Sequence, residues 1–194
     1  MEMLLWYNLI MNKPQLKKED YILYILNHWE PEKSDFWCLN KIAFLVEFAY
    51  LHFKEKPLSN AEYAAIDHGP VIDEYRETFA VMEKSGMIKT DGYKIRLVET
   101  EPMKVSGELG EFMNPLIKKY AQMTHGELKA LTHATDSYKI TTHNEKIMGN
   151  IIDKNLASLE TFFEEDSALN AAEQKQDEID LPRLDVRKLK KYEL

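Results

Sequence analysis

The sequence has very little cysteine, no long hydrophobic run and no excess of positive charge. Cys38 is the only cysteine among 194 residues, which excludes a disulfide framework or a cysteine-based zinc site within one chain. No apolar run reaches the roughly 18 residues of a membrane span, and residues 1–10 lack the basic region and cleavage site of a signal peptide. The formal net charge of −8 is not typical of a general nucleic-acid binder. These absences favour a cytoplasmic protein without a membrane segment.

The sequence also lacks the motifs of the common enzyme classes. It contains no glycine-rich dinucleotide or phosphate loop, no H-E-x-x-H pair and no G-x-S-x-G elbow. Cys38 falls within an apolar predicted helix, where a thiol is usually inert. His125 and His133 are about 80° apart around a predicted helix, so they would not chelate a metal ion together. We therefore expect no catalytic residues, no metal site and no cofactor. An enzyme that gathers His68, His133 and an acid in a cleft stays an alternative.

The sequence does contain enough apolar and aromatic residues for a folded helical domain. The hydrophobic fraction is 44% and the aromatic share is 11%, which disordered chains seldom reach. Apolar spacing predicts helices over residues 18–29 and 35–54, and the second is apolar almost all round, so it should be buried on most sides. Phe44, Phe48 and Leu51 share one arc of that helix. They either pack under the C-terminal helices or form an exposed docking patch.

The stretch AAIDHGPVIDEY, residues 64–75, lies between two segments that the sequence predicts to be helical. Ser59 has the S-x-x-E spacing of a capping box, which predicts a helix start after it. Pro70 suits the first position of a following helix, which Gly86 would end. Gly69 then provides backbone freedom at a corner between helices, and His68 hydrogen-bonds that corner rather than acting in catalysis.

Residues 87–97 carry the clearest β signal. Asp91-Gly92 predicts a hairpin turn, and apolar residues alternate with Lys89, Lys94 and Arg96 on its two arms. The order helix, helix, hairpin resembles a winged helix, and these three basic side chains are candidates for contact with DNA phosphates. Three basic residues on a solvent face are also common without that role, so DNA binding is an alternative rather than the leading hypothesis.

The following sequence predicts three further helices. Residues 106–122 are expected to be helical, with a kink or break at Asn114 because Pro115 follows. Thr-x-x-Glu capping boxes precede the segments 125–133 and 143–165, which predicts a short helix and a longer one. The residues between these two segments are predicted to form a loop.

The last thirty residues differ in charge from the rest. Residues 164–180 carry seven acidic side chains against one basic, and residues 181–194 carry five basic against two acidic. We expect a mobile tail, which is either solvated or ordered by a partner. The expected fold is mainly α: a compact multi-helix domain over residues 18–163 with one small, winged-helix-like β-hairpin near 87–97. Residues 1–17 would form an N-terminal extension.

Two stretches of the sequence resemble the Panacea domain, the SocA-like antitoxin domain that also occurs in phage and mobile-element proteins. They are LNKIAFLVEFAYLHFKEKPLSNAEYAAIDHGPVIDEYRETF and GELKALTHATDSYKI, and the resemblance covers roughly residues 20–163. The matching positions are Lys41-Ile42, Pro57-Leu58, Ala65, His68-Gly69-Pro70-Val71, Tyr75, Leu128, Leu131, Thr132 and His133. The sequence departs from the family pattern at Ile66, where Trp is frequent, and at Ser137-Tyr138, where Pro-Trp is common.

The resemblance implies a non-enzymatic antitoxin that neutralises a protein toxin, encoded by an adjacent gene, through direct binding. The motif residues would be structural or partner-binding: His68, Gly69, Pro70, Val71, Tyr75, Leu131, Thr132 and His133. Candidates for toxin contact are Phe44, Phe48 and Leu51, or Leu184 and Arg187 in the tail. SocA-type proteins hand their toxin to a ClpXP-type protease, so a proteolytic adaptor is an alternative beside the DNA-binding regulator. A homodimer is left open.

Overall fold

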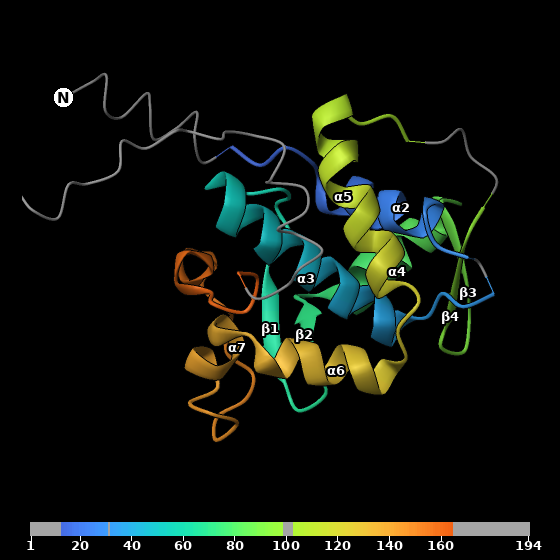
Figure 1. Cartoon of the computed structure of the whole chain (residues 1–194). Helices are drawn as coiled ribbons and strands as arrows, with labels where there is room; N and C mark the ends of the chain where they lie inside the picture. Colours follow the sequence, from blue (N-terminus) through green and yellow to red (C-terminus); the bar gives the residue numbers. More distant parts are fainter. Residues whose placement is uncertain (1–12, 31, 99–102, 165–194) are drawn as a thin grey trace, which may run out of the picture. The chain divides into compact units, whose positions relative to one another are not determined.

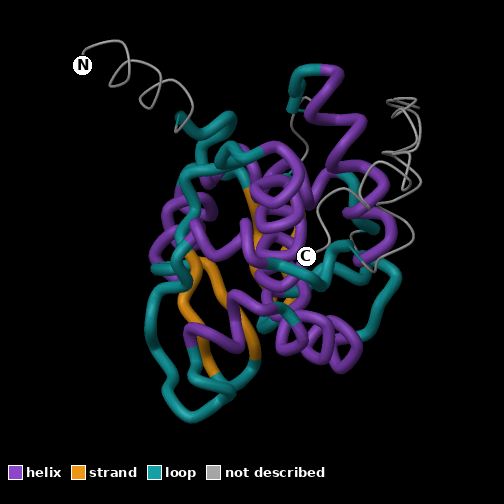
Figure 2. The backbone as a smooth tube through the Cα atoms, turned by 60° about the vertical axis from the view of Figure 1, so that its left-hand side comes forward, coloured by secondary structure: helices purple, strands orange, loops and turns teal. Residues whose placement is uncertain are grey.

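The computed structural model describes residues 13–30, 32–98 and 103–164, and its elements all belong to one unit of the chain, Met1–Phe163. The second unit, Glu164–Leu194, lies outside the described residues except for Glu164, so the charged tail with Leu184 and Arg187 stays a prediction. The described residues are mostly helical, with two short antiparallel strand pairs (Figures 1 and 2). The mainly α fold is confirmed, although the sequence predicted only one hairpin.

Helix α3 (Phe36–Lys54) lies at the centre of this unit, and helix α2 (Lys18–Asn27) packs against it. The Asp35 side chain accepts a hydrogen bond from Cys38 N at 2.8 Å and caps the start of α3. All residues from 38 to 50 are buried. The nearly continuous apolar sequence of this helix predicted that burial, because a helix without a polar face must be covered on most sides.

The stretch between α3 and the next helix forms a β-hairpin, not the predicted pair of helices with a corner. Its strands are β1 (Tyr63–Ile66) and β2 (Gly69–Ile72). The predicted helix start at Ser59 is wrong, because the hydroxyl and backbone N–H of Ser59 both donate to the buried Glu47 carboxylate, at 2.6 and 3.0 Å. Pro70 is a strand residue and not the first residue of a helix.

Pro70 fits within β2 because the residue opposite, Ala65, makes its backbone hydrogen bonds on the other edge of β1. Ala65 N donates to Asn150 O at 2.9 Å, and Ala65 O accepts from Gly149 N at 2.7 Å. The two residues are therefore a pair that exchanges no hydrogen bonds, and the missing proline N–H leaves the ladder intact. The segment 149–152 extends the hairpin along the outer edge of β1.

Helix α4 (Tyr75–Lys84) and the second hairpin follow the predicted pattern more closely. Gly86 has a positive φ of 73° just beyond α4, as expected of a glycine that ends a helix. Strands β3 (Ile88–Asp91) and β4 (Lys94–Leu97) pair in antiparallel register. The two loop residues are Gly92 and Tyr93, one position later than the predicted turn.

Helices α5 (Gly107–Tyr120) and α6 (His125–Ala134) are the next elements. Helix α5 runs without interruption through Pro115, so the predicted break at Asn114 is wrong. The predicted capping box at Thr124 is confirmed, since its side chain and that of the glutamate three residues later each bond the other residue's backbone N–H.

The residues after α6 depart furthest from the prediction. The expected loop forms helix α7 (Asp136–Thr141), and the expected helix over 143–165 is replaced by turns and the short 3-10 helix η1 (Lys154–Leu159). Residues 143–145 all have positive φ, at 51°, 55° and 66°, which a right-handed helix does not allow. The residues at 149–152 pair with β1 instead of continuing a helix.

A buried ion pair joins this C-terminal part to α3. The Glu47 carboxylate has no exposed surface and lies 3.2 Å from Lys154 Nζ. It also accepts hydrogen bonds from the backbone N–H groups of Leu58 and Ser59. Burial raises the pKa of Glu47, and the Lys154 charge and the Ser59 bonds oppose that rise. Glu47 thus positions both the chain that enters β1 and the start of η1.

Candidate functional site

Four of the residues that carry the sequence motifs meet around Gly69 at the start of β2. Gly69 has φ +95°, and a Cβ there would lie 2.8 Å from Thr132 Oγ1 and 3.3 Å from Lys41 Cε. His133 Cδ2 would lie 3.7 Å from the same point. Both the φ angle and the close neighbours therefore require glycine. These four residues, from α3, β2 and α6, are named here the motif junction.

Thr132 supports the motif junction through packing. It is fully buried, and its hydroxyl turns back onto its own helix, where Leu128 O and Lys129 O both lie 3.0 Å away as acceptors. The hydroxyl proton is thus used within α6. Thr132 provides the surface on which the Gly69 backbone rests, and its geometry does not suit a nucleophile.

Lys41 is the charged member of the motif junction, and its side chain has no exposed surface. Its Nζ donates to Trp37 O at 3.3 Å, and among the described residues it forms no ion pair. Burial lowers the pKa of Lys41 to about 8; Cys38 and Asp35 oppose that shift and the Lys129 charge adds to it. A buried ammonium without a carboxylate partner destabilises the fold, so this residue is not explained by stability.

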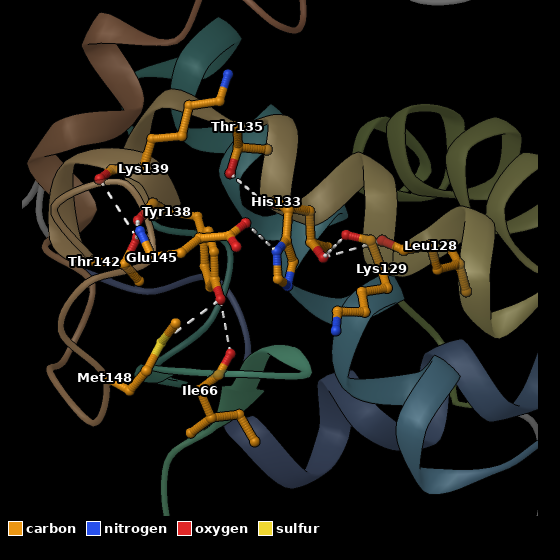
Figure 3. Close-up of polar contacts among 11 residues, drawn as sticks. Ile66, Leu128, Lys129, His133, Thr135, Tyr138, Lys139, Thr142, Glu145 and Met148 are labelled. Atoms are coloured by element: carbon orange, nitrogen blue, oxygen red, sulfur yellow. Dashed lines mark hydrogen bonds and ion pairs between the residues drawn. The ribbon is translucent and has the colours of Figure 1, made fainter.

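His133 links the motif junction to the loop after α7. Its Nδ1 lies 2.6 Å from Glu145 Oε1, and its ring rests against Tyr138 with centroids 4.5 Å apart (Figure 3). Because a carboxylate only accepts hydrogen bonds, Nδ1 carries the proton in this contact. His133 Nε2 is buried and has no hydrogen-bond partner among the described residues. The histidine at the end of α6 therefore holds Glu145 in place.

Glu145 sits in the strained part of that loop. It is the last of three consecutive residues with positive φ, and each such non-glycine residue costs roughly 1 kcal/mol or more. Glu145 N donates to Thr142 Oγ1 at 3.0 Å, and Lys146 N donates to Thr142 O at 2.8 Å. The contact with His133 and these bonds hold the strained turn beside β1.

Trp37 lies at the surface next to the motif junction, among basic side chains. Its ring centroid is 5.5 Å from that of His68, 6.1 Å from that of His125 and 6.0 Å from Lys41 Nζ. Burial lowers the pKa of His125, with a further contribution from the Lys41 charge. Lys129 acts on both Lys41 and His125. The residues Lys41, His68, His125 and Lys129 are named here the basic cluster.

A groove with a volume of about 330 Å³ begins on the other side of Trp37. Its walls come from the start of α3, from β2, from α4 and from the loop of the second hairpin. The apolar and aromatic side chains that line it are Phe36, Trp37, Val71, Tyr75, Phe79 and Tyr93. Phe36 N donates to Tyr93 O at 3.0 Å, so the hairpin loop is joined to the start of α3.

The candidate docking patch on α3 is corrected by the structure. Phe44 and Phe48 have no exposed surface and pack against Tyr63 of β1, with ring centroids at 5.5 and 6.1 Å. Leu51 is partly exposed. The two phenylalanines form the core between α3 and the first hairpin, and a partner cannot contact them in this fold.

The other motif residues occupy different environments. His68 is exposed in the turn between β1 and β2 and contacts the Trp37 ring. The predicted hydrogen bond from His68 at a corner between helices is therefore wrong, since the described residues form a hairpin turn there. Val71 and Tyr75 line the groove, and Leu131 is half-buried on α6.

The sequence singled out neither Trp37 nor Lys129, and it predicted Glu145 only as the glutamate of a capping box with Thr142, of which the bond from Glu145 N to Thr142 Oγ1 is present. Trp37 could have been found, because it precedes Lys41 by four residues and the two must share a helix face. Glu145 had no such signal, since its position depends on three left-handed residues in an irregular turn. Within the described residues no group of three His, Cys, Asp or Glu side chains is arranged to hold a metal ion.

The fold and the site together define a small helical domain with two hairpins, whose signature residues form a buried junction between α3, β2 and α6. The chain belongs to the family described as Antitoxin SocA-like, Panacea domain, whose model matches residues 39–139. No curated protein and no solved structure matches the chain. None of the helices in the part of the chain that the structure describes is long and apolar enough to cross a membrane.

Proposed function

We propose that the protein is an antitoxin that binds a protein toxin encoded by an adjacent gene and neutralises it by direct contact in the cytoplasm. The observation that carries this proposal is the family match over residues 39–139, which spans the motif junction and the groove walls of β2 and α4. The family description names antitoxins, and a toxin is the partner that an antitoxin requires.

The chemistry of the candidate site supports a binding role over catalysis. Lys41 has no exposed surface, and His133 Nε2 is buried. Burial raises the pKa of the Cys38 thiol to about 12, so this thiol is protonated and unreactive at neutral pH. These three groups are thus shielded from a substrate, whereas the aromatic groove is open to a partner.

Co-expression with the neighbouring reading frame tests the proposal. We expect that frame to arrest growth when expressed alone, and co-expression of this chain to restore growth and to yield a complex that co-purifies at a fixed ratio. An adjacent product that is harmless alone and that does not co-purify with the chain would remove the support for an antitoxin. Size-exclusion chromatography of the chain alone establishes whether it is a monomer or a homodimer.

Delivery of the toxin to a Clp-type protease is the closest alternative. The two mechanisms differ in the fate of the toxin, because blocking leaves it intact in the complex whereas delivery removes it. Toxin half-life in cells with and without the protease distinguishes them. We expect the half-life to be unchanged and growth rescue to persist without the protease.

DNA binding through the second hairpin is less favoured by the geometry. Lys94 Nζ donates to Glu32 O at 3.0 Å, and Arg96 lies 3.5 Å from the Glu32 carboxylate. Two of the three candidate phosphate contacts therefore bond Glu32, Lys94 through the backbone carbonyl and Arg96 through the carboxylate, whereas Lys89 of β3 makes no such bond among the described residues. Salt-dependent binding to the gene's own promoter would revive this alternative.

A further inference from the structure

Trp37 joins two surfaces of opposite character. On one side lies the groove, which is lined mainly by aromatic and aliphatic side chains and also by Arg76 and Glu83. On the other side lies the basic cluster, of which His68, Lys41 and His125 lie within 5.5 to 6.1 Å of the indole ring. A ligand that fills the groove and extends past the indole ring of Trp37 therefore contacts the basic cluster.

The groove has the dimensions of a pocket for an anchoring side chain. Its volume of about 330 Å³ is at the lower end of the range for pockets that bind specific groups. Phe79 and Val71 form a buried floor, and Tyr93, with 68% of its surface exposed, stands at the rim. Exposed tyrosine and tryptophan around a small apolar pocket are typical of the centre of a protein interface.

The basic cluster is a local exception in an acidic chain. The chain carries a formal net charge of −8, yet two lysines and two histidines gather beside Trp37. Asp35, an acid that acts on Lys41 and His125, also accepts the hydrogen bond from Cys38 N that starts α3. Lys41 retains unused donors, because its hydrogen bond to Trp37 O occupies one of three. Among the described residues, none of the four members of the cluster forms an ion pair with a carboxylate.

We propose that the groove and the basic cluster together bind a segment of the toxin in which a large apolar side chain is followed closely by a carboxylate. The apolar side chain enters the groove between Phe79 and Tyr93, and the carboxylate lies beyond Trp37 against Lys129 and the exposed His68 and His125, while the buried Lys41 adds its charge without contact. This inference rests on the proposed antitoxin function and adds the surface and the chemistry of the toxin segment that it recognises.

A nucleic acid is the rival ligand, since bases stack on aromatic rings and phosphates bind lysine. The groove lining contains one basic and one acidic side chain, Arg76 and Glu83, so the groove itself offers a phosphate backbone no net positive charge, which favours a protein segment. The Glu83 carboxylate is held there by the backbone N–H and the hydroxyl of Thr90, at 2.8 and 2.7 Å.

Two variants of the full-length chain test the two halves of the surface. Ala80→Trp fills the groove from an exposed position on α4, and Lys129→Glu reverses one charge of the cluster. The matched controls are Val81→Trp, at the next residue of α4 and 61% exposed, and Lys118→Glu on α5. Thermal unfolding of all four variants verifies that they fold.

Titration of each variant with the purified product of the adjacent gene gives the affinity. We expect Ala80→Trp and Lys129→Glu to bind at least about tenfold more weakly than the unmodified chain, and both controls to stay within about twofold. Equal affinities for test variants and controls would overturn the proposed surface, whereas failure of the unmodified chain to bind would instead overturn the antitoxin function.

A single-stranded RNA of about 20 nucleotides is the probe for the rival ligand. If Lys129→Glu abolishes RNA binding while toxin affinity is unchanged, the surface binds nucleic acid and the proposal is wrong. If RNA binds no variant while Lys129→Glu weakens toxin binding, the carboxylate-bearing segment is supported.

Discussion

The two β-hairpins of this domain have strands of equal length but opposite environments. All four residues of β2 and two of the four in β1 are buried, and the hairpin lies against α3 and α6. The β3–β4 hairpin buries only Ile88 and Ile95 and leaves most of its side chains exposed. The exposed hairpin was predicted from the sequence and the buried one was not. The hairpin that carries the family motif residues 68–71 is thus the one that the sequence pattern predicts less clearly.

The difference follows from what each environment requires of a strand. A half-exposed strand alternates polar and apolar residues, and that alternation is visible in β3–β4. A strand that is covered on both faces needs small or apolar residues throughout, so A-A-I and G-P-V-I in the first hairpin have no period. Pro70 added a false helix signal, since proline is also tolerated at a strand position whose partner needs no hydrogen bond.

The largest effect is expected when a methyl group is added to the buried hairpin. Gly69→Ala places a Cβ 2.8 Å from Thr132 Oγ1 at φ +95°, so both strain and overlap oppose it. We expect a loss of about 3 kcal/mol or more in the free energy of unfolding, measured by urea denaturation.

The same change in the exposed hairpin is the matched control. Gly92 has φ +58°, near the left-handed region that other residues can adopt, and nothing lies within 4 Å of the added Cβ. Gly92→Ala should cost about 1 kcal/mol. Equal losses for the two variants would show that Gly69 is needed only for its φ angle and that the packing of the motif junction is unimportant.

How much of the fold the sequence could predict depends on whether the signal was local. Helix α3, the capping box of α6 and the β3–β4 turn were predicted because capping residues and periodicity specify them within a few residues. The C-terminal part was not, because the bonds from residues 149–150 to Ala65 depend on chain segments far apart in the sequence. The family resemblance identified each residue of the motif junction. The contacts of Gly69 with Lys41 and Thr132 could not be predicted from the sequence, because they depend on the fold.

The second largest effect concerns the buried lysine that packs on Gly69, and here we expect stabilisation. Lys41→Met removes a buried ammonium without an anionic partner and keeps the apolar stem. We expect the free energy of unfolding at pH 7 to rise by about 2 kcal/mol, and toxin binding to weaken if the basic cluster binds a carboxylate. A Lys41→Met variant that unfolds more easily than the unmodified chain and binds the toxin with equal affinity would contradict both expectations.

The pH dependence of that effect has a definite sign. The folded-state pKa of Lys41 is lowered to about 8 from 10.5, so the unfolded chain binds more protons between these values. The contribution of Lys41 to the free energy of unfolding of the unmodified chain therefore rises as the pH increases from 8 to 10.5. The advantage of Lys41→Met should be greatest below pH 8 and should shrink across that window in parallel urea titrations.

A smaller effect is expected where the buried hairpin meets the segment 149–152. Gly149 has φ +89°, and nothing lies within 4 Å of a Cβ placed on it. Gly149→Ala therefore adds backbone strain without overlap and should cost about 1–2 kcal/mol, between the two other glycine variants. Hydrogen exchange at Ala65 N, which donates to Asn150 O, should accelerate with it. Unchanged protection there would mean that this segment does not stabilise β1.

The smallest effect is expected from the ion pair on the exposed hairpin. Arg96 approaches Glu32 at 3.5 Å, and both side chains are more than half exposed, so solvent screens the attraction. Arg96→Gln should change the free energy of unfolding by at most about 0.5 kcal/mol, with no difference between low and high salt beyond that amount. Toxin affinity should also stay within about twofold, because Arg96 lies outside the groove lining. A tenfold loss of affinity with unchanged stability would extend the toxin-binding surface onto the second hairpin. The contrast would then no longer hold between a buried hairpin that organises the site and an exposed one that only borders it.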